Sequence, residues 1–141
     1  MKYYRYILMT LILSLSACAT TQPLREIDLE FEGYWGEDIA DCSTNPHSIQ
    51  FSKSGEFMHI KYPKTGGTAD NKSIQNEFVY RVLGTNPDGL HLSLDGESRL
   101  NESGLAVTWD IRKISATSYC WRRSDWGSDS CTVPRTRCGS N

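Results

Sequence analysis

The sequence lacks the features that mark several large classes of protein. The apolar run over residues 7–15 is well short of the roughly 20 residues that cross a bilayer, and no longer run follows it. With 15 lysine and arginine residues against 17 aspartate and glutamate residues, the chain has no basic excess of the kind that accompanies nucleic-acid binding. These absences argue against a membrane-spanning helix and against nucleic acid as a partner.

The motifs of common enzyme classes are also missing. The three histidines, His47, His59 and His91, have no second histidine four residues away, as a helical zinc-hydrolase motif would need. No Gly-x-Ser-x-Gly segment is present to hold a serine nucleophile. We therefore expect a protein that is not an enzyme and that uses no cofactor.

Two groups of residues could hold a metal ion, and neither has the expected pattern. Four cysteines could bind zinc, but they contain no Cys-x-x-Cys pair. Glu37, Asp38 and Asp41 could supply oxygen ligands to a divalent cation, but a solvated acidic loop is the simpler interpretation. We therefore expect no metal site.

The N-terminus has a short basic segment followed by an apolar run. Lys2 and Arg5 precede the apolar run, and Leu15-Ser16-Ala17-Cys18 ends it. This segment resembles the signal and lipobox of a bacterial lipoprotein precursor, which implies cleavage before Cys18 and acylation of its thiol. The acyl chains would then anchor the protein, because each buried CH₂ contributes about 0.8 kcal/mol. The alternative is an ordinary secretory signal cut near Ala17 or Ala19.

Three regions follow from this interpretation: a signal peptide over residues 1–17, a lipidated tether over 18–25 and a single domain over 26–141. Ala19 follows the cysteine, which by resemblance to lipoproteins of Gram-negative bacteria places the protein at the outer membrane of the cell envelope. Removing the signal lowers Lys+Arg from 15 to 13 while Asp+Glu stays at 17, so the mature formal charge is −4.

The remaining cysteines predict two disulfides. Once Cys18 is set aside, an even number remains in an exported chain, where an oxidising compartment allows disulfides to form. Three pairings are possible, and in each of them the first cysteine must reach one of three near the C-terminus. The four residues are Cys42, Cys120, Cys131 and Cys138.

Alternation of apolar and polar residues predicts about seven strands and no convincing amphipathic helix. The first expected strand runs over 27–35, although Leu24, Ile27 and Phe31 also fit a helix. Polar, Gly- and Pro-containing segments separate the strands, including a long hairpin loop over 63–75. The other expected strands cover 48–52, 57–62, 77–84, 90–95, 105–112 and 119–122.

Short connections between successive strands favour an antiparallel meander. To bury one apolar face per strand, such a sheet closes on itself or pairs with a second sheet, so we expect a small up-and-down barrel, with a β-sandwich as the alternative. Gly33-Tyr34-Trp35 resembles the Gly-x-Trp that opens many lipocalins. That resemblance implies that Trp35 closes one barrel end against an arginine, for which Arg122 or Arg123 are the candidates.

A cluster of aromatic and basic residues near the C-terminus is the candidate binding surface. Such residues are enriched where proteins bind partners, and this edge could hold an anionic group. The alternative is that the tryptophans belong to the core and the arginines stack on them. The candidate residues are Trp121, Arg122, Arg123, Asp125 and Trp126.

Three functional classes remain open. The first is a non-enzymatic binding or accessory lipoprotein of the envelope, with a protein, lipid or glycan as partner. It resembles small disulfide-bonded envelope lipoproteins such as lysozyme inhibitors in general character, but their inhibitory motif is absent. The second is a carrier of a small apolar ligand inside a lipocalin-like barrel. The third is an enzyme of unrecognised type, which the apolar inward positions argue against.

Overall fold

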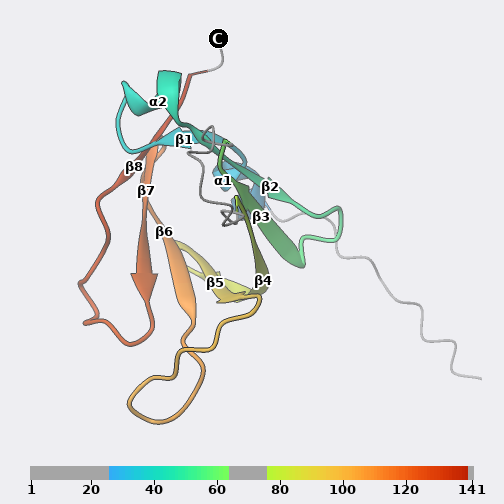
Figure 1. The fold of residues 1–141 in the computed structure, drawn as a ribbon, viewed down its shortest axis with the longest axis vertical. Coiled ribbons are helices and arrows are strands. Elements are labelled where there is room, and N and C mark those ends of the chain that lie inside the picture. Colours follow the sequence, from blue (N-terminus) through green and yellow to red (C-terminus); the bar gives the residue numbers. More distant parts are fainter. Residues whose placement is uncertain (1–25, 64–75, 140–141) are drawn as a thin grey trace, which may run out of the picture.

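Eight strands follow one another around a closed antiparallel barrel in the computed structural model, which describes residues 26–63 and 76–139 (Figure 1). The all-β up-and-down barrel expected from the sequence is confirmed, with eight strands where about seven were expected. The strands are β1 (Gly33–Gly36), β2 (His47–Phe51), β3 (Phe57–Lys61), β4 (Glu77–Asn86), β5 (Gly89–Leu94), β6 (Trp109–Ser115), β7 (Ser118–Arg123) and β8 (Arg135–Arg137).

The alternation of apolar residues places one face of each strand inside the barrel. In β2 and β3 the buried side chains Ile49, Met58 and Ile60 alternate with more exposed ones. The β4–β5 hairpin turns at the expected site, where Asn86 pairs with Gly89. A side chain at Gly89 would overlap the carbonyl oxygen of Ile111 on β6, so this position requires glycine.

The first expected strand is wrong over residues 27–31, which belong to the short helix α1 (Glu26–Phe31). Asp28 and Phe31 are buried and lie three residues apart, whereas Leu29 between them is half exposed. Buried positions three residues apart are typical of a helix, so the helix forms here although the residue types alternate as in a strand. A second short helix, α2 (Asp41–Thr44), lies in the expected loop before β2.

Two further differences lie near the C-terminus. The strand expected over 105–112 begins at Trp109, and Leu105 before it is exposed in a loop. The last strand, β8, was missed because its three residues, Arg-Thr-Arg, show no apolar alternation. This strand closes the barrel by pairing with both β7 and β1.

The arginine that packs on Trp35 is Arg137 of β8, which corrects the expectation of Arg122 or Arg123. Its guanidinium lies 4.3 Å from the centre of the Trp35 ring. It also donates to the carbonyl oxygens of Glu32, at 2.8 Å, and Glu30. The cation therefore ties the last strand to the first strand and to α1.

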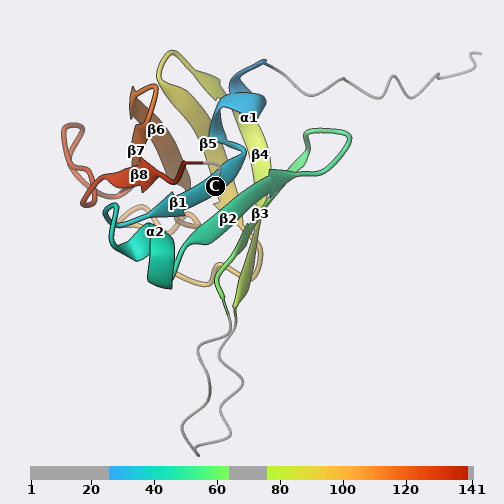
Figure 2. The same ribbon diagram turned by 90° about the horizontal axis from the view of Figure 1, so that it is seen from above.

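The up-and-down topology gives the barrel two different ends. We call the turn end the one with the tight connections 52–56, 87–88 and 116–117, and the loop end the one with the long connections 37–46, 62–76, 95–108 and 124–134. Residues 64–75, most of the loop expected over 63–75, lie outside the described residues. Figure 2 shows α1 and α2 on opposite sides of the molecule.

Helix α1 covers the turn end. Lys113, near the end of β6, forms an ion pair with Glu30, with 2.8 Å between its Nζ and the Glu30 Oε1. The Glu32 carboxylate, just after the helix, accepts from the backbone amide of Phe51 at the end of β2, at 3.0 Å. The chain therefore enters the described domain at this end. Cys18 and the rest of the expected signal and tether, residues 1–25, lie outside the described residues.

Both disulfides expected from the cysteine count are present. Cys42 pairs with Cys138, which joins the α2 connection to the end of the chain. Cys120 pairs with Cys131, which closes the connection after β7. Within the described ranges, the structure contains no helix of the length and apolar character needed to cross a membrane.

Candidate functional site at the loop end

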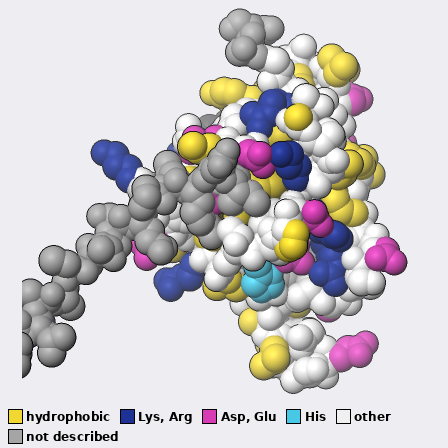
Figure 3. Space-filling view, turned by 180° about the vertical axis from the view of Figure 1, so that it is seen from behind, with side chains coloured by type: hydrophobic (Ala, Val, Ile, Leu, Met, Phe, Trp, Pro, Cys, Tyr) yellow, Lys and Arg dark blue, Asp and Glu magenta, His cyan; other side chains and the backbone are white. Residues whose placement is uncertain are grey.

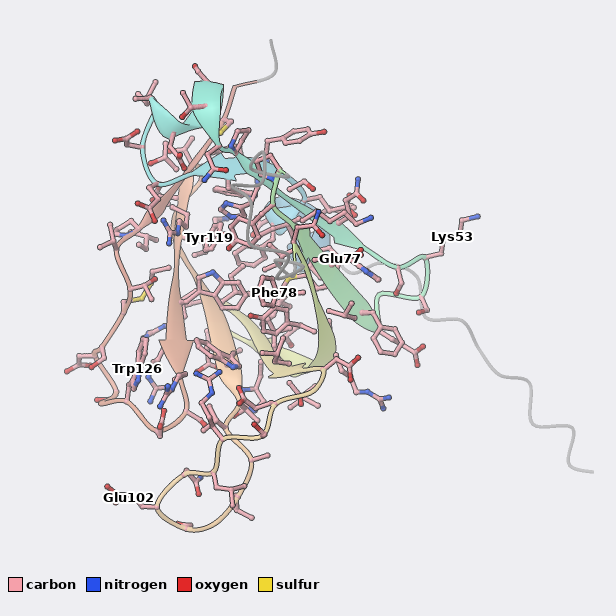
Figure 4. The ribbon with its side chains drawn as sticks, in the orientation of Figure 1. Lys53, Glu77, Phe78, Glu102, Tyr119 and Trp126 are labelled. Atoms are coloured by element: carbon pink, nitrogen blue, oxygen red, sulfur yellow. A yellow bond between two sulfur atoms is a disulfide. The ribbon has the colours of Figure 1, made fainter. Side chains whose placement is uncertain are left out.

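The barrel axis is filled by aromatic side chains that reach from α1 toward the loop end. Trp35 and Tyr119 are fully buried and meet edge to face at 4.7 Å between ring centres. Trp121 packs against Tyr119 at 6.1 Å and stacks on Tyr80 at 5.2 Å. Figure 4 shows Tyr119 and Phe78 inside the ring of strands.

A buried histidine lies in this interior. His47 Nε2 and the Tyr119 hydroxyl are 2.6 Å apart, and the His47 ring stacks on Tyr62 at 5.1 Å. Burial, helped by the charge of Arg135, lowers the pKa of His47 to about 4. Burial likewise raises the pKa values of Tyr62 and Tyr119. All three groups are therefore neutral near pH 7.

The rim of the loop end beside β6 and β7 carries a cluster of tryptophan and arginine. Trp109 and Trp126 meet edge to face at 6.2 Å. The Arg123 guanidinium lies 5.5 Å from the Trp126 ring and 6.0 Å from the Trp109 ring. Arg123 also forms a bidentate pair with Asp125, at 2.8 and 2.5 Å, which lowers the pKa of that carboxyl.

A second ion pair orders the other side of Trp109. Arg99 donates to Glu97 through Nε and Nη2, at 2.8 and 2.6 Å, and its guanidinium lies 5.3 Å from the Trp109 ring. Trp109 Nε1 donates to the same carboxylate at 3.2 Å. The hydrogen bonds from Arg99 lower the pKa of Glu97 to about 2, so this pair stays ionised over the physiological range.

The third rim arginine is also paired. Arg135 at the start of β8 forms an ion pair with Glu37 of the connection after β1. Each rim arginine, Arg99, Arg123 and Arg135, thus has a carboxylate partner. The cationic edge expected from the local sequence is therefore neutralised by acidic residues, and the partner of Arg135 comes from a distant part of the chain.

The acidic loop expected as a possible cation site is used for local structure. The Asp41 carboxylate accepts from the amide of Glu37 at 2.9 Å, and the Asp38 carboxylate accepts from the amide of Asp41 at 2.8 Å. Among the described residues, no group of three or more histidine, cysteine or acidic side chains is placed to hold a metal ion.

The five residues of the candidate binding surface lie in different places on the barrel. Arg123, Asp125 and Trp126 lie together at the rim, and Trp121 is partly buried against the core. Arg122 instead lies on the outside, where it donates to Asp110 at 2.9 Å, and Asp110 also accepts from His91 at 2.8 Å. Arg122 further donates to the carbonyl oxygens of Trp126 and Gly127, so it holds the rim loop against the barrel.

Sequence reasoning missed the residues that complete the rim. Glu97, Arg99 and Trp109 come from the β5–β6 side, and Glu37 comes from the connection after β1. The Glu-Ser-Arg spacing of residues 97–99 allowed a local ion pair, but nothing in the sequence placed it beside Trp109.

Two surface grooves lie among the described residues. One of about 230 Å³ runs beside α1 and is lined by Phe31, Trp35, Lys113 and Arg137, together with residues of the β6–β7 turn. Another of about 500 Å³ lies over β1 and β2 and is open to solvent.

No protein-family model, no curated protein and no solved structure matches this chain.

Proposed function

We propose that this protein is a lipid-anchored, non-enzymatic binding protein of the bacterial cell envelope that contacts its partner with the loop end. The lipobox around Cys18 supports export and anchoring. The observation that carries the binding role is the rim cluster of Arg123, Asp125, Trp109 and Trp126. Aromatic and arginine side chains of this kind dominate binding energies at interfaces.

The rim is already ordered, which favours binding. The bidentate Arg123–Asp125 pair fixes the guanidinium beside both tryptophans. The Cys120–Cys131 disulfide closes the connection that carries Trp126. Side chains that are fixed before binding lose less conformational entropy when a partner arrives.

A carrier of a small apolar ligand is the second candidate, and the close packing of the barrel interior argues against it. Such a carrier needs room along the barrel axis, but Trp35, Tyr119 and Trp121 occupy that axis. Of the two surface grooves, the one beside α1, of about 230 Å³, lies below the roughly 300–1,000 Å³ that is typical of small-molecule sites, and the one of about 500 Å³ lies over β1 and β2 and is open to solvent.

The test is a cross-linking pull-down from envelope extracts with the lipoprotein as bait. An Arg123→Ala, Trp126→Ala variant removes the rim cluster. The matched control is Arg81→Ala, Phe57→Ala, because Arg81 lies 5.4 Å from the Phe57 ring in the same kind of contact away from the loop end.

A partner recovered with the native protein and the control, and lost with the rim variant, supports the proposal. Equal recovery with all three proteins contradicts the assignment to the loop end. A lipid that co-purifies with the native protein in the absence of any protein partner would favour the carrier.

A further inference from the structure

Exposed aliphatic side chains project from three separate connections of the loop end. We call them the apolar tips: Ile39 is 79% exposed, Leu100 63%, Leu105 65% and Val133 71%. The loop that carries Leu100 and Leu105 is held in shape by the Leu100–Ala106 bridge and by Asn101, whose side chain accepts from the amides of Ser103 and Leu105. These leucines are therefore presented by an ordered loop.

The same end carries an acidic surplus. Its described connections, with the adjoining ends of β7 and β8, hold eight carboxylates and three arginines, and each arginine is paired with one carboxylate. Lys61 and Glu77, at the adjoining ends of β3 and β4, lie 3.6 Å apart and cancel. The surplus is therefore five acidic residues: Asp38, Asp41, Asp95, Glu102 and Asp129. Residues 64–75 add two lysines and one aspartate to the sequence of this end, which leaves the surplus acidic.

The turn end differs in charge. Around α1 and the tight turns, six acidic residues stand against five basic ones, a surplus of one, and Figure 3, which views this side, shows the two kinds interspersed. The acidic residues are Glu26, Asp28, Glu30, Glu32, Glu56 and Asp88, and the basic ones are Lys53, Arg81, Arg112, Lys113 and Arg137. The charge surplus of the domain is thus concentrated at the end that carries the apolar tips.

The two ends also differ in their distance along the chain from the proposed lipid anchor. The described chain begins at Glu26 in α1, on the turn end. The eight residues from Cys18 to Arg25 span at most about 29 Å when fully extended. The proposed anchor is therefore attached at the end opposite to the apolar tips, so these side chains can face away from the anchoring membrane.

We infer that the loop end docks a cationic protein whose contact surface has an apolar centre, and this inference rests on the proposed binding function. The surplus carboxylates would attract and orient a basic partner. The apolar tips would be buried in the contact, which removes their side chains from water and favours association. A polyanion or a single anionic group is disfavoured, because every rim arginine already has a carboxylate partner.

Site-specific photo-cross-linking in intact envelopes tests this inference on the full-length lipoprotein. A photoreactive amino acid replaces Leu105 or Val133 at the loop end, and Leu83 or Ile114 near the turn end as matched controls. The controls are also large aliphatic residues and are 49% and 53% exposed. A second form of each loop-end probe carries Glu102→Lys and Asp129→Lys, which lowers the surplus of the described residues from five charges to one.

The expected result is a protein adduct from the loop-end probes and not from the controls, with a captured protein of net positive charge. Its yield should fall about tenfold in the charge-reversed form and fall similarly at 1 M salt, where the screening length shrinks to about 3 Å. Adducts with lipid only, equal adducts from both ends, adducts insensitive to charge, or no adduct would each overturn the inference.

The proposed function can survive that failure. A protein that is lost from the pull-down with the Arg123→Ala, Trp126→Ala variant, but whose capture ignores Glu102→Lys, Asp129→Lys, would keep the binding role. It would reject the cationic partner.

Discussion

The Arg137 guanidinium lies over the ring of Trp35, 4.3 Å from its centre, and so joins the last strand of the barrel to the first. The same side chain donates to backbone carbonyl oxygens of Glu32 and Glu30. One arginine thus satisfies carbonyl groups at the end of α1 and covers the aromatic residue that plugs the turn end.

Arg137→Ala should lower the free energy of unfolding by about 2–4 kcal/mol, because a cation–π contact and hydrogen bonds from a charged donor are lost together. Urea unfolding followed by tryptophan fluorescence measures this. Arg112→Ala is the control, since its guanidinium is 3.6 Å from the Asp88 carboxylate at the surface, and it should cost less than about 1 kcal/mol. Equal effects of the two substitutions would contradict the role given to Arg137.

Stability should fall as the pH drops from 6.5 toward 4, because of His47. Its folded-state pKa of about 4 lies below the ordinary pKa of 6.5, so the unfolded chain binds the proton first. The stabilisation is fully present above pH 6.5, and about 2 kcal/mol should be lost by pH 5.

Urea unfolding at pH 7 and pH 5 checks this prediction. His47→Gln should remove most of the difference, because the amide does not titrate and can still meet the Tyr119 hydroxyl. His59→Gln serves as the control, and it should retain the pH dependence. A native protein that is equally stable at both pH values would show that His47 is not kept neutral by burial.

The two disulfides should differ in their contribution to stability. The pairs are separated by 96 residues for Cys42–Cys138 and by 11 for Cys120–Cys131. In the chain-entropy account a longer closed loop restricts the unfolded state more, at roughly 5 kcal/mol for about 100 residues and roughly 3 kcal/mol for about 15. Thermal unfolding of the two double Cys→Ser variants should therefore give the lower Tm for the Cys42, Cys138 pair, and the reverse order would contradict this account.

Gly89→Ala should destabilise the protein by about 3 kcal/mol or more, because the added methyl group would overlap the carbonyl oxygen of Ile111. Gly84→Ala, five residues earlier in the same hairpin, is the matched control. A methyl group there meets no atom within 4 Å, so this variant should be as stable as the native protein or slightly more stable. Chemical unfolding of both variants distinguishes the two sites, and a tolerated Gly89→Ala would contradict the packing of β5 on β6.

Cys18→Ser should abolish lipid attachment without changing the fold, since the lipobox thiol would be gone. Metabolic labelling with palmitate and membrane fractionation measure the loss of attachment, and circular dichroism of the purified protein measures the fold. We expect no label on the variant and a native-like spectrum. Label that persists after the Cys18→Ser substitution would contradict the lipoprotein interpretation.

Much of the barrel could be predicted because its strands alternate regularly, as Leu90 and Leu92 do in β5. Residues 26–31 could not, because the same residue types alternate with a period of two while burial follows a spacing of three. Strand β8 could not be predicted from the sequence either, since it is held by pairing with β1 and β7 and not by apolar side chains of its own.

The chemistry at the loop end depends even more on distant contacts. The local sequence around Arg123 and Arg135 is rich in basic residues, and it suggested a cationic edge. The carboxylate that neutralises Arg135 comes from Glu37, almost a hundred residues earlier, and Glu97 supplies the pair beside Trp109. Only the closed barrel brings these residues together.

The two disulfides are nested, because Cys120 and Cys131 both lie between Cys42 and Cys138 in the sequence. Of the four cysteines in the disulfides, a chain exported from its N-terminus presents Cys42 first, Cys120 second and Cys138 last. An oxidant that acts on cysteines as they emerge would join Cys42 to Cys120, a pairing that the folded barrel does not contain. Thiol–disulfide exchange must then free Cys42 for Cys138. If the chain is exported as we propose, its maturation should therefore depend on a disulfide isomerase as well as on an oxidase.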